Sequence, residues 1–169
     1  LANSMDSFIP VNEPDLTGNE KKYLIECVET GWISSEGPYV TKFEEQFAAR
    51  MGRKYGVAIC NGTAALVAAV RALKLSPGDE VILPAFAIIS CITAILESGL
   101  KPVLVDAEPR TWNMDVNQIE AKLTPKTRAI MEVHTYGLPV EINRVLEIAK
   151  RHNLRIIEDA AEMHGQTYK

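Results

Sequence analysis

The sequence has few cysteines, no basic run and no long apolar run, and each absence removes a class of protein. Its three cysteines, Cys27, Cys60 and Cys91, are far apart and odd in number. That argues against a disulfide framework or a zinc site and fits a reducing, cytoplasmic compartment. The net charge of -4 without a basic cluster argues against nucleic acid and anionic membranes as partners. No apolar stretch reaches transmembrane length, so no membrane partner is expected.

What remains is the composition of an ordinary globular protein. Hydrophobic residues make up 47% of the 169 residues and charged residues 24%, which is enough for one domain with a real core. Residues 1–4 are interpreted as an expression remnant ahead of a native start at Met5. Residues 5–54 are expected to form an N-terminal arm with helices, and residues 55–169 a partial cofactor-binding domain.

Two helices are expected in the N-terminal part, at about 18–30 and 42–51. Thr17 is placed to cap the first helix, with Glu20 three residues on as the second half of a capping box. Gly31 then ends that helix. The prolines and glycines around these segments predict an irregular arm and loop.

From residue 55 onward, short apolar strands alternate with helices. Strands are expected at 56–60, 81–83, 103–105, 129–133 and 155–158, and helices at 63–75, 88–96, 115–123 and 141–152. Asp115 and Gln118 predict a capping box for the third of these helices. This alternation predicts an α/β fold, a mostly parallel sheet with helices on both faces.

The most informative stretch follows the last expected strand. Ile156 and Ile157 are followed by Glu158, Asp159 and, three residues further, Glu162. Ligands of parallel α/β sheets bind beyond the carboxyl ends of the strands. A carboxylate held there requires a cationic or hydrogen-bonding partner, and a protonated pyridine nitrogen is one such partner. The alternative is that the two carboxylates only cap the next helix.

A second strand end carries Asn61, Gly62, Thr63 and Ala64. Gly62 permits a tight turn and close approach to a ligand. The amides of residues 62–64 are expected to be free at a helix N-terminus, where the dipole favours an anion. The pattern is compatible with a phosphate-binding turn, but it lacks the fuller signature of a P-loop or a dinucleotide-binding motif, so taken alone it favours a plain strand-to-helix turn with a threonine cap.

A third strand end carries Pro84 to Ile88, whose side chains can cover a flat ligand. Phe86 alone is read as a core residue, and His134 as a structural histidine rather than a catalytic one. A phosphate-binding turn, a covering loop and a carboxylate at the same sheet edge together describe a pyridoxal phosphate pocket.

Several motifs, taken in order, resemble one known family. They are Gly31-Trp32-Ile33-Ser34-Ser35, Asn61-Gly62-Thr63-Ala64-Ala65-Leu66, Pro77-Gly78-Asp79-Glu80-Val81-Ile82, Pro102-Val103-Leu104-Val105-Asp106, His134-Thr135-Tyr136-Gly137 and Glu158-Asp159-Ala160-Ala161-Glu162. The chain resembles the N-terminal part of the DegT/DnrJ/EryC1/StrS sugar aminotransferases. The resemblance covers nearly the whole chain from Val11.

This resemblance implies a pyridoxal 5'-phosphate-dependent transferase of fold type I, here a partial large domain. It implies that Gly62 and Thr63 bind the cofactor phosphate, that Asp159 pairs with the pyridine nitrogen, and that Glu162 contacts the region of the ring's 3'-oxygen. Asp159 and Glu162 are thus the expected catalytic residues. Ile88 occupies a position that is often aromatic in the family, so it is expected to cover the ring without stacking.

The implied reaction moves an amino group, usually from glutamate, to the keto carbon of a nucleotide-linked sugar. Within the family the resemblance is greatest to perosamine-forming enzymes, whose substrate is GDP-4-keto-6-deoxymannose. A homodimer is implied. The Schiff-base lysine of the family lies in a segment beyond Lys169, so this chain is expected to be an inactive fragment.

Other functions remain open. One alternative is a sugar dehydratase of the same fold, with histidine in place of the lysine, and another is a non-catalytic module that senses a cofactor or ligand. A Rossmann-type nucleotide binder is disfavoured, because the first expected strand is followed by Asn61-Gly62-Thr63 rather than G-x-G-x-x-G.

Overall fold

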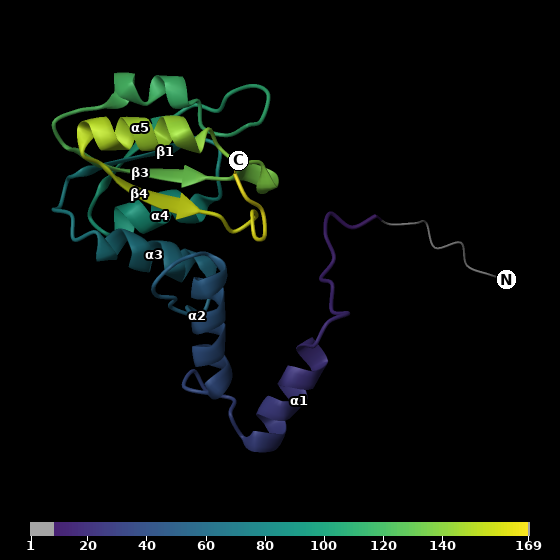
Figure 1. Cartoon of the computed structure of the whole chain (residues 1–169). Helices are drawn as coiled ribbons and strands as arrows, with labels where there is room; N and C mark the ends of the chain where they lie inside the picture. Colours follow the sequence, from purple (N-terminus) through teal and green to yellow (C-terminus); the bar gives the residue numbers. More distant parts are fainter. Residues whose placement is uncertain (1–8, 169) are drawn as a thin grey trace. The chain divides into compact units, whose positions relative to one another are not determined.

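The computed structural model describes residues 9–168, so the interpretation of residues 1–4 lies outside it. The chain divides into two compact units, with the boundary between Ala58 and Ile59 (Figure 1). None of the described helices is both long and apolar enough to cross a membrane.

The first helix, α1 (Glu20–Thr30), lies where the sequence predicted it and ends at Gly31, whose φ is 76°. Its predicted capping box is wrong. The helix begins after Asn19 without a side-chain cap, and Thr17 instead donates its amide and hydroxyl to the Asp15 carboxylate. A local turn onto an aspartate competes with capping and has drawn the threonine away from the helix.

The second helix, α2 (Pro38–Arg50), begins four residues earlier than predicted. Proline suits the first helical position because its φ is already helical and its missing N–H needs no acceptor. The ring of Tyr39 packs 5.1 Å from that of Tyr23 on α1, and its hydroxyl donates to Glu26 at 2.7 Å. The two helices therefore contact each other through an aromatic pair.

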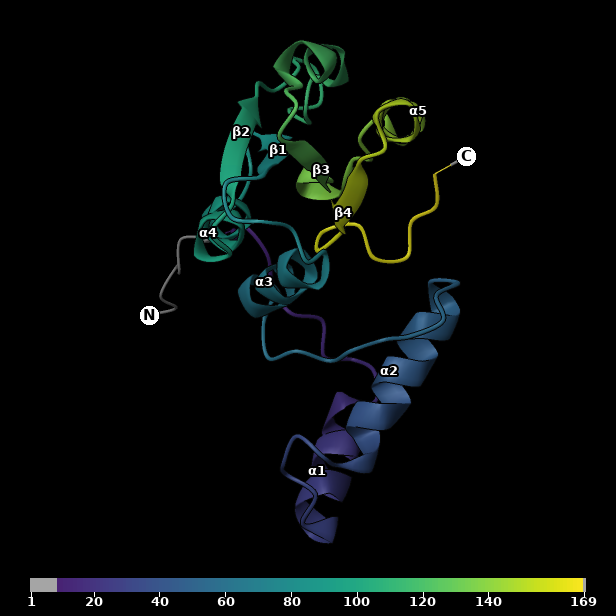
Figure 2. The same cartoon turned by 90° about the vertical axis from the view of Figure 1, so that its left-hand side faces the viewer.

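The second unit contains a four-stranded parallel sheet. The strands are β1 (Glu80–Pro84), β2 (Lys101–Val105), β3 (Thr127–Val133) and β4 (Arg155–Asp159). Their order is β2-β1-β3-β4, and every pair is parallel (Figure 2). The predicted parallel sheet is confirmed, and its carboxyl ends share one edge.

The first of the five expected strands, at 56–60, is absent from the sheet, and this prediction is wrong. This segment pairs with no strand among the described residues, and Val57 and Ile59 are 76% and 39% exposed. Apolar β-branched residues suit a strand, but a strand also needs a neighbouring edge to complete its hydrogen bonds. The free edges of the sheet, on β2 and β4, do not pair with it.

Helices cover both faces of the sheet (Figures 1 and 2). One face packs against α3 (Gly62–Ala72) and α4 (Ile89–Glu97), and the other against α5 (Ile142–His152). Strand alternation separates the two cores, because successive side chains point to opposite faces. On β1, Val81 and Leu83 join the α3–α4 core, whereas Ile82 joins the α5 core.

Two details on the α5 face differ from the prediction. An amphipathic helix at 141–152 was expected to bury Leu146 together with Ile142, Val145 and Ala149, but Leu146 is 50% exposed, and Ile148 is buried in that core instead. The helix predicted at 115–123 is two short 3₁₀ turns, η1 (Val116–Gln118) and η2 (Glu120–Lys122). Asp115 does cap the first turn by accepting from the Asn117 amide, but the segment continues as 3₁₀ turns rather than as an α-helix.

Candidate functional site

The carboxyl end of β4 places Asp159 on the α3–α4 face of the sheet, two residues after the buried Ile157. The Asp159 carboxylate is half-buried and accepts from the Ala161 amide at 3.1 Å and the Cys91 thiol at 3.5 Å. Burial and the neighbouring Asp159 charge raise the pKa of Cys91 to about 12. The thiol therefore stays protonated and acts as a donor, which fixes one oxygen of Asp159.

A cavity of about 380 Å³ opens at this edge of the sheet. Its described lining residues are Phe86, Ala87, Ile88, Val133, His134, Thr135, Tyr136, Asp159, Ala161 and Glu162. The fold thus brings together three of the predicted site residues, Ile88, Asp159 and Glu162. Two carboxylates line the cavity, and no lysine or arginine is among these lining residues.

Glu162 is held against the loop that follows β3. Its Oε2 atom accepts from the Tyr136 amide at 2.7 Å, and Tyr136 has the unusual φ of 52°. Gly137 follows with a φ of 79°, and a Cβ there would lie 2.9 Å from the Glu162 carbonyl oxygen. The two segments are therefore in close contact, and only glycine fits at the second position.

The N-terminus of α3 carries Gly62 and Thr63. The preceding Asn61 caps the helix by accepting from the Ala64 amide at 2.9 Å, so the prediction that this amide is free is wrong. The amides of Gly62 and Thr63 still have no acceptor within the helix, because an α-helix leaves its first N–H groups unpaired.

Gly62 and Thr63 do not line the 380 Å³ cavity; Thr63 borders a separate, open hollow along α3. The first turn of α4 nevertheless contacts both the N-terminus of α3 and the cavity residue Asp159. Ser90 lies with its hydroxyl 2.7 Å from that of Thr63, and the next residue, Cys91, contacts Asp159. Thr63, expected to bind the cofactor phosphate, and Asp159, expected to pair with the pyridine nitrogen, thus each form a hydrogen bond with one of two consecutive residues of α4.

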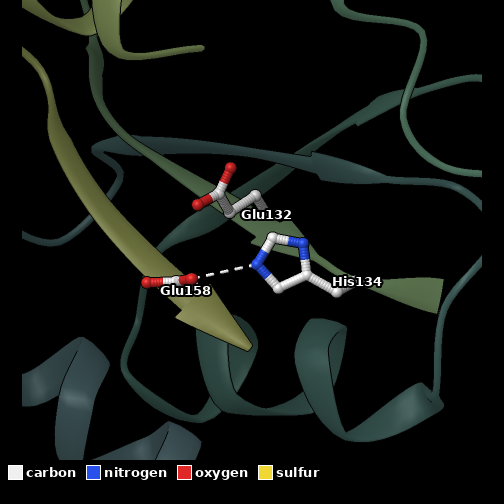
Figure 3. Close-up of side chains that lie close together, drawn as sticks. All are labelled: Glu132, His134 and Glu158. Carbon is white, nitrogen blue, oxygen red and sulfur yellow. Dashed lines mark hydrogen bonds and ion pairs between the residues drawn. The ribbon is translucent and has the colours of Figure 1, made fainter. Parts of the chain in front are cut away.

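The opposite face of the strand ends carries a second polar group, formed by Glu132, His134 and Glu158 (Figure 3). His134 is 2% exposed, and its Nε2 atom lies 3.0 Å from a Glu158 oxygen. Glu132 is fully buried, and neither of its carboxylate oxygens has a hydrogen-bond partner in the described structure. Burial, and then the charge of Glu158, raise the pKa of Glu132 to about 8.

Potential ligand atoms of these three residues lie within 4.8 Å of one another, which invites comparison with a metal centre. The hydrogen bonds of the histidine argue against one. The Val140 amide donates to His134 Nδ1 at 3.2 Å, so in the neutral ring the proton resides on Nε2 and points to Glu158. A metal-binding histidine instead donates from its second nitrogen. His134 is organised as a structural hydrogen-bonding residue.

Sequence reasoning missed some of these contacts. Glu132 was visible as a lone carboxylate inside an otherwise apolar strand, a pattern that signals either a partner or an altered pKa. Ser90 and Cys91 lie on the helix expected at 88–96, and nothing in the sequence identified their hydrogen-bond partners. Asn113 also bonds to the loop after β3, and no local pattern predicts such a long-range contact.

The chain is similar to known proteins over nearly its whole length. Residues 14–169 match the DegT/DnrJ/EryC1/StrS aminotransferase family. The GDP-perosamine synthase of Escherichia coli O157:H7 is 48% identical over 162 residues, which are 96% of this chain and 44% of that protein. The chain therefore spans less than half the length of this relative.

Solved structures share the fold. The aminotransferase from Psychrobacter cryohalolentis has a TM-score of 0.84 at 35% identity, over 94% of this chain and 41% of that one. The E. coli GDP-4-keto-6-deoxy-D-mannose-3-dehydratase with bound hydrated PLP has a TM-score of 0.88 at 27% identity, over 95% and 42%. The fold is that of the type I pyridoxal phosphate enzymes, in part, and the chain belongs to the DegT/DnrJ/EryC1/StrS aminotransferase family.

Proposed function

We propose that this chain is the cofactor-binding part of a pyridoxal phosphate-dependent nucleotide-sugar aminotransferase. The observation that carries the proposal is Asp159, which lies at the end of β4 in a cavity shared with Ile88 and Glu162. When bound, pyridoxal phosphate supplies an electron sink for reactions of amino groups. The residues of this chain would hold and polarise it.

The lining of the cavity fits this cofactor. Two carboxylates face a space whose described lining holds no lysine or arginine, so a cationic ring nitrogen would find complementary charge there. The cavity walls are otherwise largely apolar and aromatic, which suits a flat ring. The paired hydroxyls of Thr63 and Ser90, beside the N-terminus of α3, suit a phosphate.

Each residue then has a distinct task. Asp159 would accept a hydrogen bond from the pyridine nitrogen and keep it protonated, while the Cys91 thiol and the Ala161 amide fix the carboxylate. Gly62 and Thr63 would bind the phosphate. Ile88 would cover one face of the ring by dispersion, and Glu162, held by the Tyr136 amide, would lie at the 3'-oxygen.

We infer the substrates from the relatives. The greater identity to a GDP-perosamine synthase than to the dehydratase favours amino transfer from glutamate to GDP-4-keto-6-deoxymannose. The dehydratase is the second candidate because it has the same fold, with a TM-score of 0.88. Incubation of the full-length protein with the keto sugar and glutamate separates the two, since transamination yields an amino sugar and dehydration a 3-deoxy sugar.

We also propose a homodimer in the cytoplasm. Large apolar side chains are exposed in the N-terminal unit, among them Leu24 at 68%, Val28 at 72% and Ile33 at 80%. Such residues favour association. The three cysteines are free, which fits a reducing compartment. Light scattering coupled to size exclusion of the full-length protein tests the dimer, and a monomeric mass at working concentration would contradict it.

The central test is Asp159→Asn in the full-length protein. We expect the affinity for pyridoxal phosphate to fall roughly ten- to hundredfold, since a hydrogen bond to a charged group contributes about 1.5–3 kcal/mol. Asp106→Asn is the matched control, because Asp106 also follows a strand of this sheet but lies outside the cavity lining. Unchanged cofactor affinity in Asp159→Asn would refute the assignment.

A further inference from the structure

Asn113 occupies an unusual place for a polar side chain. It is 2% exposed, and both ends of its amide are used. Its Oδ1 atom accepts from the Thr135 amide at 2.9 Å, and its Nδ2 atom donates to the Leu138 carbonyl at 3.0 Å. The side chain therefore joins both ends of the turn that contains Tyr136 and Gly137.

That turn requires support from outside itself. Tyr136 has a φ of 52° and Gly137 a φ of 79°. A non-glycine residue in the left-handed region is strained and persists where its surroundings hold it. The bonds from Asn113 satisfy the backbone groups on each side of the strained pair. A side-chain amide is suited to this task because it offers one acceptor and one donor in a planar arrangement.

Asn113 is itself rigidly held. It lies in a short hairpin that follows β2, in which Ala107 pairs with Met114 in antiparallel fashion. The Glu108 amide donates to the Asn113 carbonyl at 2.9 Å, and the Asn113 amide donates to the Thr111 hydroxyl at 3.3 Å. The hairpin thus fixes the position from which the amide reaches the turn.

The loop segment that contains Tyr136 and Gly137 also holds the Glu162 side chain. The Tyr136 amide donates to Glu162 Oε2 at 2.7 Å, and Tyr136 lines the cavity together with Glu162. We propose that Asn113 is a positioning residue, which orients the Glu162 carboxylate at the cofactor through the Tyr136 turn. Asn113 does not line the cavity. The effect of Asn113 on the cofactor rests on the proposed function, whereas its effect on the positions of Tyr136 and Glu162 does not.

The first test measures hydrogen exchange of the Tyr136 amide by NMR in this chain. Asn113→Ala removes both bonds, and Asn113→Asp keeps the acceptor but sets a carboxylate oxygen against the Leu138 carbonyl. We expect Tyr136 exchange to accelerate about tenfold or more in both variants, as buried partners lose their bonds. Asn117→Ala is the control, because its exposed side chain bonds only locally, to Asp115.

The amides of β3 report whether each variant is folded. Unchanged Tyr136 exchange in Asn113→Ala, with β3 still protected, overturns the proposal. Should the alanine variant lose β3 protection, the isosteric aspartate variant decides on the same criterion. A merely structural asparagine would accelerate the exchange of β3 and Tyr136 by similar factors, and a similar acceleration of both in the aspartate variant also counts against positioning.

The second test uses the full-length protein loaded with pyridoxal phosphate. Glu162→Gln is expected to shift the pH dependence of the cofactor's absorption band. Asn113→Ala, which adds no charge, should shift it in the same direction, with Asn117→Ala unchanged. An unchanged pH dependence in Asn113→Ala contradicts the proposal. If the full-length protein binds no cofactor, the proposed function fails, and the Tyr136 exchange rates still decide the role of Asn113.

Discussion

Glu132 makes the stability of this chain depend on pH in an unusual direction. The carboxylate is fully buried in β3, its oxygens have no partner in the described structure, and Glu158 adds a second negative charge nearby. Its pKa rises from an ordinary 4.5 to about 8. The folded chain therefore keeps a proton that the unfolded chain releases. Replacing Glu132 with leucine, of similar size, removes this penalty.

The magnitude follows from the linkage between proton binding and folding. The penalty is absent below the unfolded pKa of 4.5 and grows until pH passes the folded value of about 8. A difference of one in pKa corresponds to about 1.4 kcal/mol, so the full rise of about 3.5 corresponds to about 5 kcal/mol above pH 8. At pH 7 the same relation gives about 3 kcal/mol. These values are large beside a typical domain stability of about 5–15 kcal/mol.

Urea unfolding of the wild-type chain and Glu132→Leu, from about pH 5 to pH 9, measures this effect. The variant should gain stability relative to the wild type as pH rises, by the amounts above. Glu132→Gln should remove the pH dependence while keeping a buried polar group. Glu147→Gln is the control, because it makes the same charge change on an exposed side chain of α5. Parallel profiles for the wild type and both Glu132 variants would refute the reasoning.

Two further predictions concern the opposite end of the sheet and the cavity. Glu80 is buried, and the Thr124 hydroxyl and then Lys101 hold its pKa below the ordinary value. Glu80→Gln should lower the free energy of unfolding by about 1–3 kcal/mol at neutral pH. At acidic pH the difference between wild type and variant should become smaller, because the wild-type carboxylate takes up a proton. Urea unfolding at several pH values measures both effects. Ile88→Phe should tighten pyridoxal phosphate binding by about 0.5–1.5 kcal/mol through ring stacking, whereas Ile89→Phe, outside the cavity lining, should not; equal effects of both in a cofactor titration would contradict this.

The parts of the fold that the sequence predicted are those governed by local patterns. The apolar runs that became β1, β3 and β4 are bounded by turns and by helices of clear period, and the parallel arrangement followed from their alternation. The segment 56–60 has the same local character but lacks a partner edge. The segment shows that a strand forms only where a neighbouring strand completes its hydrogen bonds, and the local sequence does not identify that neighbour.

The candidate site likewise has residues that local patterns predicted and residues whose contacts depend on distant parts of the chain. The position of Asp159 at a strand end followed from composition and topology alone. The acceptor for the Ala64 amide was missed because Asn61 was read as part of a ligand-binding turn rather than as a cap. Asn113 was missed because its partners, Thr135 and Leu138, are distant in sequence, and a buried asparagine looks the same in sequence as an exposed one.

The register of β4 explains how two adjacent carboxylates serve opposite faces of the sheet. Glu158 pairs with Glu132 across the ladder, and Asp159 pairs with Val133. Since side chains alternate along a strand, a slip of one residue would exchange the two acids. Ile156 and Ile157 oppose such a slip, because each packs in the core of its own face. The same two isoleucines that identify the strand in the sequence therefore also determine that Asp159, and not Glu158, faces the cavity.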